Sequence, residues 1–166
     1  MSLVARLKTV FLFLNLLLIP LAASAQTGGT TTQNVTLTAQ PILRLQVSGN
    51  PDPLIVTQAV AGSEPSAVQD TKTSYSLVTN LDNVKIVASI NQVMPAGTTL
   101  TLTLGSTRGT GRGAVNISNA TTPLEVVSNI RKGADKNQTI TYSFGALSSA
   151  GQISSASRIV TLTLTN

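Results

Sequence analysis

Hydrophobic and polar residues alternate along much of the chain, and the pattern is clearest near the start of the domain. Apolar residues occupy most odd positions over residues 35–47, and polar residues fill most of the even ones, with Ile42 as the exception. Side chains alternate between the two faces of a β-strand, so this pattern predicts an apolar face about thirteen residues long. Pro41 has no backbone N–H and interrupts the ladder. We therefore predict two collinear strands, over residues 33–40 and 42–48.

Further alternating segments follow at short intervals. Residues 73–79 and 84–90 flank an Asn/Asp-rich turn, which predicts a β-hairpin. Residues 98–104 direct three leucines inward and threonines towards solvent, and residues 158–165 repeat that arrangement. Shorter strands are predicted over 54–57, 114–118, 124–128 and 139–144, and residues 59–71 are predicted to form a loop.

These segments predict the fold class and the content of the core. Eight to ten short strands without a convincing helix predict an all-β fold, an immunoglobulin-like antiparallel β-sandwich in a single domain over residues 33–166. A sandwich is favoured over a closed barrel because the strands are short and some loops reach about a dozen residues. Tyr75, Tyr142 and Phe144 alternate in phase with aliphatic neighbours, so we expect all three in the core.

An apolar run over residues 10–19 precedes the domain and has the features of an export signal. Arg6 and Lys8 lie before it, and Ala23-Ser24-Ala25 after it matches the A-x-A pattern of a cleavage site. The run is about ten residues long, half of the roughly 20 that a membrane-spanning helix needs, which disfavours an uncleaved anchor. We predict a cleaved signal peptide over 1–25, a flexible tail over 26–32, and a secreted or cell-surface protein without a membrane span.

Composition then excludes several classes of function. The chain contains no cysteine and no histidine, which removes thiol nucleophiles, thiolate metal sites, disulfides and the commonest general base. Without Arg6 and Lys8, nine scattered basic residues face six acidic ones, a net charge of about +3. No aromatic residues interleave with these charges, so we expect no nucleic-acid surface. The sequence thus predicts a protein that is not an enzyme and needs no cofactor or catalytic metal.

Two weaker patterns could indicate ligand binding, but we favour a purely structural interpretation of each. The segment Gly109–Gly113 lacks the lysine and the helix of a phosphate-binding loop, so it predicts a mobile glycine-rich hairpin loop. The six acidic residues are isolated in the sequence, which is typical of solubilising loop residues. A calcium site would require residues to converge at one end of the sandwich, although the EF-hand spacing is absent. The candidates for such a site are Asp70, Asn80, Asp82 and Asn83.

Residues 34–50 (NVTLTAQPILRLQVSGN) resemble the first strand of alternate chaperone–usher fimbrial major subunits of the colonisation-factor type. The end, residues 158–166, resembles the terminal strand of these subunits and of spore-coat-U-like secreted pilins. The resemblance covers about a third of the domain, and residues 91–157 carry none of it. It implies an immunoglobulin-like fold assembled by donor-strand complementation, in which the N-terminal extension of one subunit fills a groove in its neighbour. The implied partners are copies of the chain and a periplasmic chaperone.

Two hypotheses of function follow. The first is an exported structural protein of the cell surface or extracellular matrix, a pilus or filament subunit whose strand-donor contacts are Val35, Leu37 and Ala39. The alternative for these three residues is packing inside their own domain. The second hypothesis is a secreted adhesin or carbohydrate-binding module that uses the loops 59–71, 105–113 and 131–137, since loops on a rigid sandwich are the usual recognition surface.

Overall fold

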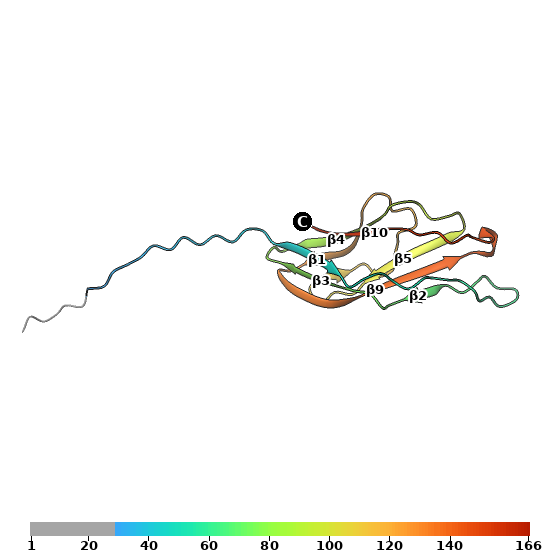
Figure 1. Ribbon diagram of the computed structural model, residues 1–166, viewed down its shortest axis with the longest axis horizontal. Helices are drawn as coiled ribbons and strands as arrows, with labels where there is room; N and C mark the ends of the chain where they lie inside the picture. The colour runs from blue at the N-terminus through green and yellow to red at the C-terminus, as the bar shows by residue number, and fades with distance from the viewer. Residues whose placement is uncertain (1–28) are drawn as a thin grey trace, which may run out of the picture. The chain divides into compact units, whose positions relative to one another are not determined.

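The computed structural model describes residues 29–166, so the predicted signal peptide over 1–25 and the first part of the predicted tail lie outside the described residues. Residues up to Leu37 and residues from Thr38 form two units, which are described separately. All ten strands of the described residues lie in the second unit (Figure 1).

Two antiparallel sheets make up this unit. The first has the strand order β1-β3-β9-β5-β7, with β2 beside β9, and the second has the order β10-β4-β8-β6. The strands of the first sheet are β1 (Leu43–Val47), β2 (Val68–Asp70), β3 (Ser74–Thr79), β5 (Thr98–Leu104), β7 (Val115–Asn116) and β9 (Gly133–Ala146). Those of the second sheet are β4 (Val84–Ile90), β6 (Thr110–Gly111), β8 (Leu124–Ile130) and β10 (Val160–Thr165); a short 3-10 helix, η1 (Ser148–Ala150), follows β9. This confirms the predicted all-β antiparallel sandwich, and the strand number falls within the predicted eight to ten.

The core lies between the sheets and follows the period of two. Alternate residues of β4 are almost fully buried, from Val84 at 0% exposed to Ile90 at 3%. The three leucines of β5 are buried as predicted, while the two threonines between them, Thr101 and Thr103, are half-buried. Burying each such aliphatic side chain stabilises the fold by about 1.5–3 kcal/mol, so the central strands carry most of the stability.

The predicted hairpin over residues 73–90 is wrong. β3 pairs with β1 and β9, whereas β4 pairs with β8 and β10, so the turn at 80–83 carries the chain from one sheet to the other. Asn83 takes a left-handed φ of 60°, a conformation that asparagine tolerates better than most residues. β3 and β4 would each turn one apolar face to the core whether they formed a hairpin or lay in two facing sheets. The alternation therefore does not distinguish the two arrangements.

Three other predicted elements differ from the structure. Residues 33–40 and 54–57 form no strand, and β2 lies inside the segment predicted as the loop 59–71. Leu54 is half-buried and packs on the core without joining a sheet. Prolines flank these segments, and each proline removes a ladder donor, so alternation of side chains alone did not produce a strand there.

Tyrosine side chains fill the core as predicted. Tyr75 is 1% and Tyr142 is 8% exposed, and Phe144 is half-buried against the same cluster. The Tyr75 hydroxyl donates to the Gly105 carbonyl oxygen at 2.5 Å. Burial raises the pKa of Tyr75 to about 12, with the charge of Asp135 adding to the effect and a hydrogen bond with Ser106 opposing it.

Stability is expected to fall as pH rises from about 10 to 12. In this window the unfolded chain releases the Tyr75 proton and the folded chain retains it, so the stabilisation is complete below pH 10 and lost above 12. The loss is about 2–3 kcal/mol at roughly 1.4 kcal/mol per pKa unit. Urea unfolding at pH 9 and pH 12 should show a smaller drop in Tyr75→Phe than in the parent. Equal drops in the two proteins would contradict this assignment.

Candidate functional site

The predicted donor segment is exposed. Residues 33–40 have no regular secondary structure, and Val35 and Leu37 are 70% and 87% exposed. Ala39 is exposed as well. Donation to a neighbouring copy and packing inside their own domain both stay predictions for these three side chains. We refer to residues 33–40 as the arm.

The root of the arm is held by one side chain. Asn80 accepts a hydrogen bond from the Ile42 N–H at 2.7 Å through its Oδ1 and donates from Nδ2 to the Gln40 carbonyl oxygen at 2.8 Å. Asn80 is the next position after Thr79 in the β1–β3 register, where the backbone of β3 already turns towards the other sheet. The side-chain amide thus extends the ladder by one rung, across Pro41.

Among residues 29–166, one side of the sandwich ends in two edges that no other strand pairs with. β1 is the last strand of the first sheet and β10 is the last strand of the second, and the two contact each other across the sheets. Their inward side chains are only half-buried, unlike those of the central strands. These side chains, which we call the open seam, are Leu43, Leu45, Val160, Leu162 and Leu164.

The main chain of the seam residues faces the free edges. Ser48 donates its N–H to the Ser74 carbonyl oxygen at 2.9 Å, and alternate residues of an antiparallel strand turn their N–H and C=O to opposite sides. Even-numbered residues of β1 therefore bond to β3, and Leu43 and Leu45 direct their main-chain groups away from it. The same argument applies to β10, because the Asn91 N–H donates to the Ile159 carbonyl oxygen at 3.0 Å. An added strand would find both an apolar surface and unpaired main-chain groups there.

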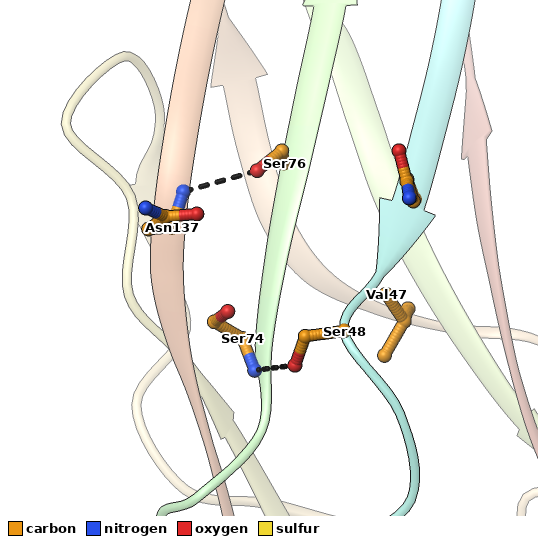
Figure 2. A pocket seen from close by; sticks show the side chains of 6 residues that line it. Val47, Ser48, Ser74, Ser76 and Asn137 are labelled. Atoms are coloured by element: carbon orange, nitrogen blue, oxygen red, sulfur yellow. Dashed lines mark hydrogen bonds between the residues drawn. The ribbon is translucent and has the colours of Figure 1, made fainter.

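The outer face beside β1 carries a shallow polar hollow of about 220 Å³ (Figure 2). Two of its hydroxyls are already occupied: Ser48 Oγ accepts from the Ser74 N–H at 2.9 Å, and Ser76 Oγ accepts from the Asn137 N–H at 3.1 Å. The other lining residues are Gln46 and Val47. The hollow is smaller than the roughly 300–1,000 Å³ of usual ligand pockets, and neither an aromatic nor a charged residue lines it.

A buried carboxylate braces the loop after β5. Asp135, on β9, is 3% exposed and accepts hydrogen bonds from Ser106 Oγ at 3.1 Å, Thr107 Oγ1 at 2.8 Å and the Thr107 N–H at 2.9 Å. Asp70 is also buried, at 6%. The interpretation of all six acidic residues as solubilising loop residues is therefore wrong for these two.

The glycine-rich segment 109–113 is structured. β6 lies within it and pairs with β8, and a Cβ at Gly109 would come within 2.7 Å of an Ile130 side-chain carbon. Gly109 is thus required by close packing. No phosphate-cradle geometry is needed to explain it.

The three loops of the adhesin hypothesis do not gather at one end. Arg108 donates to the Lys132 carbonyl oxygen, which ties the loops 105–113 and 131–137 together near the start of β9. Glu64 accepts from the Ser148 N–H at 2.6 Å, which places the loop 59–71 at the far end of β9 (Figure 1). Loop 59–71 is therefore separate from the other two.

The calcium candidates do not all converge, because Asp70 lies in β2 and the other three lie in the turn 80–83. Asp82 accepts from the Lys132 N–H at 3.1 Å, Asn80 holds the root of the arm, and Asp70 lies opposite Tyr142 on β9. Within residues 29–166, no three acidic side chains come together in an arrangement that could hold a metal ion.

Comparison with family models finds none that matches this chain, and comparison with curated proteins finds no similar sequence. In the part of the chain that the structure describes, no helix is both long enough and apolar enough to cross a membrane.

Proposed function

We propose that this chain is an exported, non-enzymatic structural protein of the cell surface or extracellular matrix, whose copies join when the arm of one fills the open seam of the next. The observation that carries the proposal is the pairing of two complementary features in one chain. The arm exposes apolar side chains at every second position, and the seam leaves apolar side chains half-buried beside unpaired edges.

The arm suits the seam physically. Val35, Leu37 and Ala39 share one face of the arm if it becomes extended, with threonines and glutamine on the other. Burying Val35 and Leu37 would contribute about 1.5–3 kcal/mol each. Main-chain hydrogen bonds to an edge would add about 0.5–1.5 kcal/mol each. Both terms oppose the cost of ordering the arm, which is about 1–2 kcal/mol per residue for the backbone.

Export accompanies this function. The predicted signal peptide over residues 1–25 would carry the chain out of the cytoplasm, and a chain without cysteine needs no oxidative folding there. An uncovered apolar seam with two free edges is an aggregation hazard before assembly. We therefore include a periplasmic chaperone that covers the seam during transit among the proposed partners.

The adhesin or carbohydrate-binding alternative has less support. Two of its loops are braced together, but the third lies at the other end of the sandwich. Tyr75 and Tyr142 are buried in the core, so neither offers the exposed aromatic platform that sugar-binding sandwiches commonly use.

Removal of the arm tests the proposal. The mature chain, residues 26–166, is expected to form polymers in size-exclusion chromatography and electron microscopy, and the chain without residues 26–40 is expected to remain a monomer.

A further inference from the structure

The arm has a competing place to bind, which is the edge of its own β1. A hairpin centred on Pro41 would pair residue 39 with 43, 37 with 45 and 35 with 47. Residues directly opposite each other in an antiparallel pair lie on the same face, so Leu37 would reach the seam beside Leu45. Such a closed monomer would hide the seam and prevent assembly.

The segment 40–42 resists that reversal. A hairpin loop of three residues places its last residue in the left-handed region, where a β-branched side chain such as Ile42 is a genuine outlier. Pro41 also holds Gln40 towards extended conformations. The side chain of Asn80 then fixes Gln40 and Ile42 through the two hydrogen bonds described above, at 2.8 and 2.7 Å.

We infer that Asn80 is a positioning residue that keeps the arm from folding back on its own β1 edge and so reserves it for a second copy of the chain. The inference rests on the proposed function. Turning the arm back requires both Asn80 hydrogen bonds to break, because a loop over 40–42 cannot keep Gln40 and Ile42 on the same side-chain amide. Asn80 therefore decides which of two edges, its own or a neighbour's, the arm occupies.

Engineered disulfides can report where the arm lies, because the natural chain has no cysteine. The mature chain carrying Leu37→Cys and Leu45→Cys is oxidised, and the products are separated on a non-reducing gel. An internal bridge gives a faster-migrating monomer, and bridges between copies give a ladder. The same chain is then compared with Asn80→Ala, Asn80→Asp and Asn91→Ala added in turn.

Loss of the two Asn80 hydrogen bonds should shift the products towards the internal bridge. Asn80→Ala removes both hydrogen bonds, and the ratio of internal bridge to ladder should rise by about tenfold or more. Asn80→Asp keeps the acceptor for the Ile42 N–H and loses the donor to Gln40, so its ratio should lie between those of the parent and Asn80→Ala. Asn91→Ala is the matched control, because Asn91 Oδ1 accepts from the Ile159 N–H at 2.9 Å at the start of β10 and does not touch the arm. Its ratio should equal that of the parent.

The experiment tests the positioning role of Asn80 separately from the donation of the arm to a second copy. An unchanged ratio in both Asn80 variants, or a mainly internal bridge in the parent, would overturn the role of Asn80. If the parent forms neither product, donation to the β1 edge fails. The Asn80→Ala chain then decides the role of Asn80. An internal bridge in that chain supports the role, and no internal bridge in that chain overturns it.

Discussion

Deleting residues 26–40 is expected to abolish polymers of the mature chain while leaving a folded monomer. The core cluster is built entirely from residues beyond the arm. The deletion removes one exposed hydrogen bond, from Asn80 to the Gln40 carbonyl oxygen, so the free energy of unfolding should fall by no more than about 1.5 kcal/mol. Polymer formation should fall by at least about a hundredfold, since burial of Val35 and Leu37 alone is worth about 3–6 kcal/mol. Light scattering after size-exclusion chromatography measures polymer formation, and thermal melting measures the change in stability.

A pair of neighbouring substitutions provides the control. Leu37→Asp places a charge on the face that would enter the seam, whereas Thr38→Asp places the same charge on the opposite face. Only Leu37→Asp should block assembly. If the deletion instead unfolded the protein, the arm would belong to its own core and the proposed donation would be wrong.

Replacing the buried Asp135 with alanine is expected to lower the free energy of unfolding more than any other single substitution of a side chain outside the apolar core. The Thr107 N–H and two hydroxyls would lose a buried charged acceptor, at a cost of about 2–4 kcal/mol. In a domain of this size the melting temperature should fall by about 10 °C. Urea unfolding of the parent and Asp135→Ala measures the loss.

Asp52→Ala is the matched control for Asp135. Asp52 forms an ion pair with Lys72, but both side chains are more than half exposed, so the change should stay below about 1 kcal/mol. Equal losses in the two variants would show that the Asp135 hydrogen bonds are not a structural brace.

The fold class followed from the period of two, and the same period explains where prediction ended. Alternation identified the buried leucines of β5 and the aliphatic face of β4 because both strands lie at the centre of a sheet. It could not decide whether β3 and β4 form a hairpin or face each other, since both arrangements bury the same residues. That choice depends on pairings such as β3 with β9, which join residues about sixty positions apart.

Of the features in the proposed assembly, the sequence alone points to the arm and not to the seam, for a related reason. The proposed donor residues Val35, Leu37 and Ala39 stand out in the sequence because Pro41 separates them from β1. The seam does not stand out, because Leu45 and Leu162 alternate just as the fully buried leucines do. Their half-burial arises from strand order, which leaves β1 and β10 at the sheet edges. Asp135 is equally hidden in the sequence, since its partners lie almost thirty positions away.

The most direct test of the account is a mixture of two single-cysteine chains, because only a contact between copies can then join them. One mature chain carries Leu37→Cys in the arm, and the other carries either Leu45→Cys or Leu162→Cys in the seam. Thr163→Cys, on the exposed face of β10, serves as the control. Arm donation predicts a covalent heterodimer from at least one seam position, at a yield about tenfold or more above that of the Thr163 control. Heterodimer yields no higher than the control from both seam positions would contradict it.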